Sequence, residues 1–310
     1  MTSRFLSSLT RIAFAIAILF VLQGSGSAQT LSNNYSDIKP GSILFFNRYT
    51  SNPANPQQGD TQFNITNLNQ SKDALIHLFL IDGSTCSVAD FGLSLTPNQT
   101  ISILMSDYDP GIYGYMIAVA ESFDTGLPTQ FNWLAGSAYI RENDGRKAIL
   151  PAISIGKVSA GDIAPTNGEY KLKFNGADYE KLPSGLAVIS FDSQVLAQST
   201  LYIYTPPTNL FFGDVTTVNV FTLLYDDAEK SLSSSFTVTC YRQDSFITLF
   251  NRGGGINRHV PPGRTGWLKF SASGGPILGS VITRGAVFEG GYNLHAFALL
   301  GSYEITLPVF

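Results

Sequence analysis

The sequence predicts an all-β protein built from two tandem immunoglobulin-like antiparallel β-sandwich domains related by internal duplication. Short apolar runs alternate with turn formers at intervals of about 8–15 residues, which is typical of antiparallel sandwiches. The chain has 22 Phe, 14 Tyr and 29 Gly but only 14% charged residues, which favours strands over helices. Its two halves also share a series of residue matches in the same order.

The strand signals are clearest in the first half of the chain. Runs rich in β-branched and aromatic residues predict strands at 42–46, 61–66, 75–81, 100–105 and 113–120. Turn formers, such as those at 109–111, separate the runs. Because the run 113–120 is apolar at nearly every position, it predicts a central strand that is buried on both faces.

The matches between the halves predict a duplicated domain with a period of about 155–165 residues. Phe63-Asn64-Ile65 is echoed by Val218-Asn219-Val220, and a cysteine follows each segment at nearly the same distance. Three further pairs come in the same order: 96–100 with 261–265, Gly114 with Gly279, and 131–134 with 292–295.

The repeat and the turn-rich stretches set the expected boundaries. They are an export signal at 1–28, a flexible segment at 29–38, a first domain at 39–158, a linker at 159–168 and a second domain at 169–310.

The first 28 residues resemble a cleavable export signal. Arg4 and Arg11 lie before an apolar run at 12–22, which is too short to span a bilayer. Gly26 and Ala28 follow this run and fit the pattern of small residues at a signal cleavage site. Removing this signal changes the net charge from −4 to −6 and leaves no expected transmembrane span. The acidic balance excludes an electrostatic footprint for nucleic acid. We therefore expect a secreted, periplasmic or cell-surface protein.

Cys86 and Cys240 would enter an oxidising compartment. Their sequence separation leaves open a disulfide or two buried thiols, and we favour the disulfide. The repeat predicts that the two cysteines occupy equivalent places in the two domains. A disulfide would therefore link either the two domains of one chain or two protein molecules.

Several residues suggest chemistry, but each has a simpler structural interpretation. The acidic clusters at 107–109 and 226–229 would offer oxygen ligands to calcium, yet ordinary turn chemistry explains them better. His77, His259 and His295 show no metal-ligand spacing and lie near no nucleophile motif. We therefore predict no catalytic residue, no cofactor and no metal site.

Aromatic residues provide the remaining lead. Trp133 and Trp267 lie near expected strand ends, where an exposed ring would stack on a sugar or contact a protein partner. Packing in the core is the competing interpretation.

Several segments resemble a group of exported proteins from environmental bacteria. The resemblance rests on the segments 95–100, 106–111, 114–120, 224–229 and 262–267. It implies an exported protein with duplicated β-sandwich-like domains. The group carries no assigned activity, so the resemblance implies no functional residue.

These observations predict an exported, non-enzymatic binding or structural protein with a protein or glycan partner. Two alternatives are a carbohydrate-binding or adhesion module and a secreted hydrolase with dispersed carboxylates.

Overall fold

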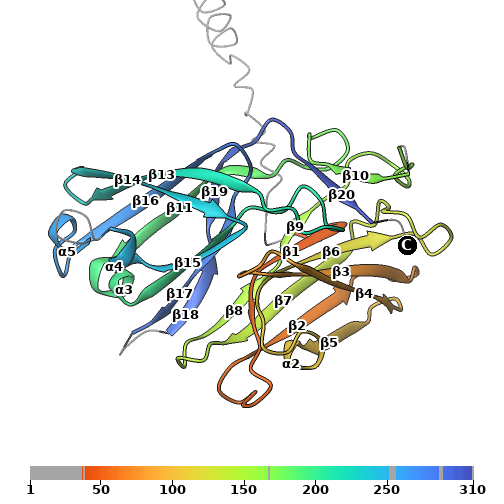
Figure 1. Cartoon of the computed structure of the whole chain (residues 1–310), viewed down its shortest axis with the longest axis horizontal. Coiled ribbons are helices and arrows are strands. Elements are labelled where there is room, and N and C mark those ends of the chain that lie inside the picture. Colours follow the sequence, from red (N-terminus) through yellow and green to blue (C-terminus); the bar gives the residue numbers. More distant parts are fainter. Residues whose placement is uncertain (1–36, 38, 167, 251–255, 286–288, 309–310) are drawn as a thin grey trace, which may run out of the picture. The chain divides into compact units, whose positions relative to one another are not determined.

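The computed structural model describes residues 37, 39–166, 168–250, 256–285 and 289–308. The predicted export signal at 1–28 lies outside these residues. The chain from Asn34 to Phe310 forms one compact unit. Its described residues are mainly strands in several antiparallel sheets (Figure 1), so the all-β prediction is confirmed.

Two sheets come from the first half of the chain. Sheet A has the order β4-β3-β6-β1-β9 and sheet B the order β5-β2-β7-β8. Sheet A contains β1 (Ile43–Thr50), β3 (Ala74–Asp82), β4 (Val88–Leu95), β6 (Tyr113–Glu121) and β9 (Ile153–Ile155). Sheet B contains β2 (Asp60–Asn67), β5 (Thr100–Leu104), β7 (Leu134–Arg141) and β8 (Lys147–Pro151). Phe46 of sheet A packs on Phe63 of sheet B with 4.8 Å between ring centroids, so a core lies between the sheets.

The second half contributes two more sheets. Sheet C has the order β14-β13-β16-β11-β19 and sheet D the order β15-β12-β17-β18. Sheet C contains β11 (Pro183–Asp192), β13 (Thr217–Asp226), β14 (Ser231–Thr239), β16 (Thr265–Ser273) and β19 (His295–Leu299). Sheet D contains β12 (Ser199–Tyr204), β15 (Tyr241–Ser245), β17 (Leu278–Arg284) and β18 (Glu289–Asn293). Val220 and Leu268 of sheet C join Leu201 and Val281 of sheet D in a second core.

The remaining elements are short. A ribbon of two strands, β10 (Tyr170–Lys173) and β20 (Glu304–Leu307), joins the start of the second half to its end. The described helices have four or five residues each: α2 (Met105–Tyr108), α3 (Ser193–Ala197), α4 (Phe246–Leu249) and α5 (Ile256–His259).

The strand order repeats between the halves. Adding ten to every strand number of sheet A gives the order of sheet C, and sheets B and D are related in the same way. An immunoglobulin sandwich pairs its first two strands in one sheet. Here β1 pairs with β6 and β9, whereas β2 belongs to the other sheet. The immunoglobulin-like part of the prediction is therefore not confirmed.

The register of the sheets shows which residues correspond. Gly114 pairs with Asp82 in sheet A as Gly266 pairs with Asp226 in sheet C. The counterpart of Gly114 is thus Gly266 and not Gly279, so this residue match was wrong.

The first match, of 63–65 with 218–220, is wrong for the same reason. The first segment lies in β2, whereas the second lies in β13, the counterpart of β3. Short apolar segments resemble one another whichever sheet they belong to, so the sequence match equated strands of different sheets.

Burial follows the apolar pattern of the strands. β13 alternates between exposed and buried residues from Thr217 to Thr222, as expected for a strand with one face in a core. By contrast, β1 is buried at all eight positions, and β6 is buried from Gly114 to Ala120. The predicted central strand at 113–120 is therefore confirmed.

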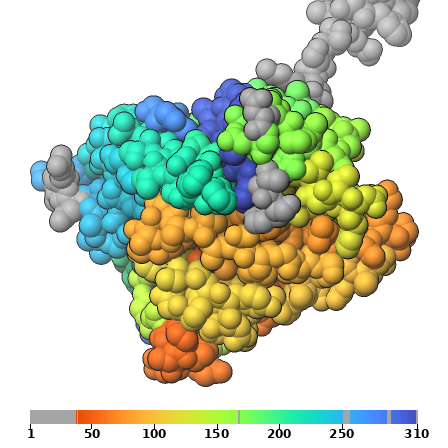
Figure 2. Space-filling model, turned by 45° about the vertical axis from the view of Figure 1, so that its right-hand side comes forward, coloured from red at the N-terminus to blue at the C-terminus, as the bar shows by residue number. Residues whose placement is uncertain are grey.

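Sheet A is buried on both faces because the second half covers its outer face. Tyr115 of β6 stacks on Tyr204 of β12 with ring centroids 3.9 Å apart and an interplanar angle of 19°. Phe45 of β1 contacts Phe174, which follows β10. Figure 2 shows second-half residues, in cyan, lying directly against first-half residues, in orange.

A buried ion pair lies where the halves meet. Arg48 donates from Nε and Nη2 to the two carboxylate oxygens of Glu142, at 2.7 Å each, and both side chains are almost fully buried. Tyr202 and Tyr241 of the second half pack against the guanidinium. Burial alone lowers the pKa of Arg48, but Tyr241 and Glu142 more than offset this, so its pKa lies above the ordinary value and the group stays charged.

An amide network accompanies this pair. The side chain of Asn47 donates to the carbonyl oxygen of Gly279, at 3.0 Å, and to the side-chain oxygen of Asn293, at 2.8 Å. It accepts a hydrogen bond from Tyr204 Oη at 2.9 Å. Polar groups of β1 are thus satisfied by strands of sheet D, as buried polar groups require.

We expect Arg48→Met to lower the free energy of unfolding by about 3–5 kcal/mol, because it leaves the carboxylate of Glu142 buried without its partner. Urea denaturation measures this. The double variant Arg48→Met/Glu142→Leu should lose much less, and so should Arg264→Met, which breaks the solvent-exposed Arg264–Asp227 pair. A single Arg48→Met variant as stable as the parent chain would contradict this account.

We also expect His77 to stabilise the fold most at low pH. Its Nε2 lies 2.9 Å from Asp90 and its Nδ1 lies 3.4 Å from Glu121. Burial lowers the pKa of His77, but hydrogen bonds to Glu121 and Asp90 outweigh burial and raise the pKa above its ordinary 6.5.

Because the folded-state pKa is raised, this stabilisation is complete below about pH 6.5 and is lost as the pH rises through the folded-state pKa. The difference in unfolding free energy between the parent chain and His77→Gln should therefore shrink as the pH is raised from about 6 to about 9. A constant difference across this range would disprove the role of His77.

Candidate functional site

A groove with a volume of about 710 Å³ lies on the outer face of sheet B. Strand alternation turns Phe63 and Ala138 into the core and leaves Gln62 and Tyr139 outside. The register places four outer residues in one row across the sheet: Leu104, Gln62, Tyr139 and Ile149. This row forms the floor of what we call the sheet B groove.

The floor is unusually apolar for an exposed sheet face. Leu104, Tyr139 and Ile149 are 41%, 49% and 58% exposed. Outward positions of a solvated antiparallel sheet are normally polar. Contiguous exposed apolar residues with a polar rim are typical of a binding surface.

The adjacent row carries charge. Asp60 pairs with Arg141, and Arg141 pairs with Lys147, so two positive side chains stand directly opposite each other. Like charges in this position destabilise a sheet. The carboxylate of Asp60 is engaged elsewhere, since it accepts hydrogen bonds from the backbone N–H of Thr61 and from the N–H and hydroxyl of Ser106.

The walls of the groove come from both halves of the chain. On one side, Arg141 Nη1 donates to the carbonyl oxygens of Pro56 and Gln57, at 3.3 Å and 2.9 Å, and so holds the loop before β2. On the other side, β18 contributes Glu289 and the two glycines that follow it. A Cβ on Gly291 would lie 2.9 Å from the Cβ of Ala148, so β18 lies against β8.

A second exposed surface lies on the outer face of sheet C. Tyr225 of β13 pairs with Trp267 of β16, and their rings stack with centroids 4.5 Å apart and an interplanar angle of 9°. Beside them, the ammonium of Lys269 lies 5.1 Å from the ring centroid of Phe297. Phe221 is also exposed on this face. We call these five residues the sheet C face.

Hydroxyl groups border the sheet C face. Ser231 pairs with Tyr225 and Ser235 with Phe221, while Ser233 lies between them on the same edge strand, β14. All three serines are exposed. The face therefore combines flat apolar rings with a row of hydrogen-bonding groups.

The counterpart positions in sheet A are buried. The register equates Trp267 with Tyr115 and Tyr225 with Ile81, because Ile81 pairs with Tyr115 as Tyr225 pairs with Trp267. Tyr115 and Ile81 have no exposed surface. Corresponding positions are thus fully buried in sheet A, whereas in sheet C Trp267 is exposed and Tyr225 half-buried.

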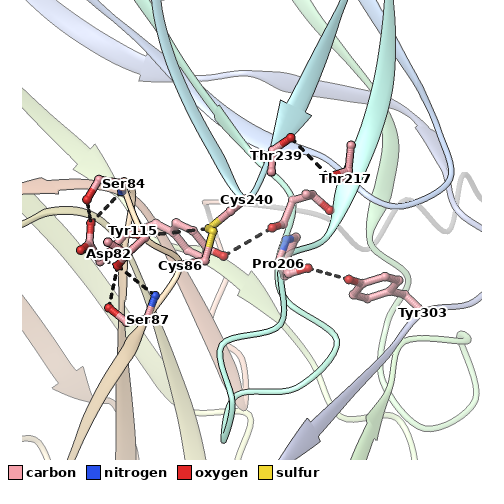
Figure 3. Close-up of a disulfide and its surroundings, with 12 residues drawn as sticks. Asp82, Ser84, Cys86, Ser87, Tyr115, Pro206, Thr217, Thr239, Cys240 and Tyr303 are labelled. Carbon is pink, nitrogen blue, oxygen red and sulfur yellow. Dashed lines mark hydrogen bonds between the residues drawn. A yellow bond between two sulfur atoms is a disulfide. The ribbon is translucent and has the colours of Figure 1, made fainter.

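Cys86 and Cys240 are joined in a disulfide, with their Cα atoms 6.0 Å apart (Figure 3). The bridge connects the first half to the second half. Cys86 follows β3 and Cys240 follows β14, so the two do not occupy corresponding places in the sheets, contrary to the expectation from the repeat. The Asp82 side chain orders the turn at Cys86 by accepting hydrogen bonds from Ser84.

The two tryptophans lie in different sheets. Trp133 immediately precedes β7 and is 49% exposed, whereas Trp267 lies within β16 and is 38% exposed. The structure therefore does not gather them into one site. Trp267 belongs to the sheet C face, and Trp133 lies outside both surfaces defined above.

The acidic residues considered for calcium take part in local structure. Asp109 accepts a hydrogen bond from Tyr49 Oη at 2.5 Å. Asp226 accepts from backbone N–H groups of its own turn, and Asp227 pairs with Arg264. Burial raises the pKa of Asp109, although the bond from Tyr49 opposes this shift.

The three histidines belong to three separate elements, with His77 in β3, His259 in α5 and His295 in β19. Within the described part of the chain, no group of three His, Cys, Asp or Glu residues is placed to hold a metal ion.

Sequence reasoning missed the sheet B groove. Tyr139, Arg141, Lys147 and Ile149 come from two adjacent strands joined by a tight turn. Their alternation with buried Ala138, Ile140, Ala148 and Leu150 was visible in the sequence. Alternation identifies the two faces of a strand but does not show which residues of β2, β5 and β18 lie beside them.

Comparison with known proteins adds little. No protein-family model and no curated protein matches the chain. The solved structure of the PBSX exported protein XepA covers 77% of this chain and 84% of its own, at 7% identity and a TM-score of 0.22. Vicilins from Solanum lycopersicum (tomato) and Capsicum annuum cover 86% of this chain and 74% and 75% of their own, each at 9% identity, with TM-scores of 0.18 and 0.17. Likenesses this weak carry no argument about this chain.

None of the helices in the described ranges has the length and hydrophobicity needed to cross a membrane.

We expect the double variant Cys86→Ser/Cys240→Ser to lose about 2–5 kcal/mol of unfolding free energy, since the bridge closes a long loop over a separation of 154 residues. Urea denaturation without reductant measures the loss. The reduced parent chain should match the double variant. An unchanged stability in both would show that the bridge does not contribute.

Proposed function

We propose that this chain is an exported, non-enzymatic binding protein of the periplasm or cell surface that holds carbohydrate on the sheet C face. The observation that carries the proposal is the stacked pair of half-buried Tyr225 and exposed Trp267, which lies on the outer face of sheet C and is bordered by serine hydroxyls.

The chemistry of this surface suits a sugar. Pyranose rings have apolar faces that pack on flat aromatic rings, and their hydroxyls need hydrogen-bonding partners at the edges. Tyr225 and Trp267 supply the aromatic surface, while Ser231 and Ser233 supply polar groups beside it. Tyr and Trp are also the residues that contribute most strongly to binding surfaces.

We further infer that the chain arose by duplication of one β-sandwich. The identical strand orders of sheets A and C, and of sheets B and D, support this inference. Under this interpretation, the position of Trp267 is aromatic in both halves, since it corresponds to Tyr115, whereas Tyr225 stands where sheet A has Ile81. Retaining exposed rings carries a solubility cost, so a ligand accounts for them better than a structural role does.

Two features support export. The first 28 residues have the pattern of an export signal. The Cys86–Cys240 disulfide suits an oxidising compartment, because disulfides persist outside the cytosol.

We expect Trp267→Ala and Tyr225→Ala to weaken binding to neutral polysaccharides more than about tenfold, because truncating a central aromatic of a binding surface costs about 2 kcal/mol or more. A glycan array would identify the ligand, and isothermal titration calorimetry would measure the affinity. Trp133→Ala, which removes an exposed indole outside the surface, is the matched control and should bind normally.

Three results would count against the proposal. They are no signal on any glycan, equal losses in Trp133→Ala and Trp267→Ala, and concentration-dependent dimers that Trp267→Ala abolishes. The last would show that the face binds a second copy of the chain. Thermal melting of each variant checks that the fold is retained.

A further inference from the structure

We propose that the sheet B groove binds an acidic polysaccharide, with Arg141 and Lys147 holding a uronate carboxylate and Tyr139 supporting the sugar rings. This site is independent of the sheet C face, because its floor and charges come from the first half of the chain.

Two positive side chains lie beside each other in the groove. Arg141 and Lys147 face each other across β7 and β8, and the carboxylate of Asp60 is used by Ser106 and Thr61. Among the described residues, the ammonium of Lys147 has no partner. A bound anion between two adjacent cations would remove the repulsion that this pairing creates.

The geometry of Arg141 fits the same role. Its Nη1 is occupied by the carbonyl oxygens of Pro56 and Gln57. Within the described residues, Nε and Nη2 of the same guanidinium are left for a ligand. A carboxylate is the planar acceptor that a guanidinium binds best, and Lys147 adds a second donor to it.

Apolar and polar surfaces lie beside these charges. The apolar row of Leu104, Tyr139 and Ile149 is followed by a polar row that includes Asn64, Ser102 and Ser137. Ser102 donates to the side-chain oxygen of Asn64 at 2.6 Å. A sugar chain with apolar ring faces, hydroxyl edges and a carboxylate is complementary to these neighbouring charged, apolar and polar rows.

The length of the groove floor also favours an oligosaccharide. The floor row crosses four strands, and strands lie about 4.8 Å apart, so the row extends about 15 Å. This length suits an oligosaccharide segment better than a single sugar or a lone carboxylate. Glu289 on the β18 wall offers an acceptor for sugar hydroxyls on the far side.

The net charge, −4 for the full chain and −6 without residues 1–28, does not oppose such a ligand. At physiological ionic strength, charges more than about 8 Å away are largely screened, so the charged groups that line the groove, Arg141 and Lys147 with Asp60 and Glu289, decide where an anion binds. The same screening requires that added salt weaken the binding.

The test is calorimetric titration of the purified chain with hexagalacturonate, in EDTA to exclude calcium bridging. Its fully methyl-esterified form is the matched neutral ligand. We expect the ester to bind at least about tenfold more weakly than the acid, as the loss of a charge-assisted hydrogen bond predicts. Raising NaCl from about 50 to about 500 mM should also weaken binding of the acid.

Variants locate the site. Lys147→Gln should weaken binding about tenfold, Lys147→Arg should retain it, and Tyr139→Ala should weaken it. Lys72→Gln removes an exposed positive charge in the turn before β3 and should bind as the parent does. Trp267→Ala should also bind normally, which separates this site from the sheet C face.

Four results would overturn the proposal. They are absence of hexagalacturonate binding, equal affinity for acid and ester, equal losses in Lys72→Gln and Lys147→Gln, and hexaglutamate binding as tight as hexagalacturonate. The last would assign the groove to an acidic peptide.

Discussion

The ion pair between Arg48 and Glu142 places a strong constraint on the rest of this structure. Removing two charges from water costs several kcal/mol for each ion, and the attraction between them offsets that cost only when the geometry is good and nearby groups complete the shell. The carboxylate comes from the first half of the chain, but the aromatic rings around the guanidinium include Tyr202 and Tyr241 of the second half. The first half alone would leave the pair partly solvated, and the second half alone would expose its tyrosines. The halves therefore depend on each other where β1 meets sheet D.

Because of this dependence, corresponding sheets of the two halves differ in whether their outer face is buried. Sheet A buries its outer face through Tyr115, and sheet D buries its outer face through Tyr202 and Tyr204. Sheets B and C keep exposed outer faces with large side chains, Tyr139 in one and Trp267 in the other. Each half thus has one sheet whose outer face is used for internal packing and one whose outer face is open to a partner. The two candidate binding surfaces are the open faces.

The predictions that succeeded rest on local patterns. Turn formers between short apolar runs identified an all-β chain, and the apolar segment 113–120 identified a strand buried on both sides. Those that failed required knowledge of strand pairing. Gly114 was matched with Gly279, whereas the register of sheet A equates it with Gly266. Glycine is common in this chain, and only hydrogen-bonded neighbours show which glycine occupies a given place in a sheet.

The sequence by itself determined the class of structure, because the alternation of apolar and polar residues reports the period of a strand directly. It also identified Trp267 as a candidate for an exposed ring. The tertiary structure alone decided which faces are covered, which strands are neighbours, and that Cys86 reaches Cys240. It alone brought Arg141, Lys147 and Tyr139 beside Gln62, Leu104 and Glu289. The physical reason is that strand pairing and face-to-face packing are long-range contacts, and each strand carries the same two-residue period whichever partner covers it.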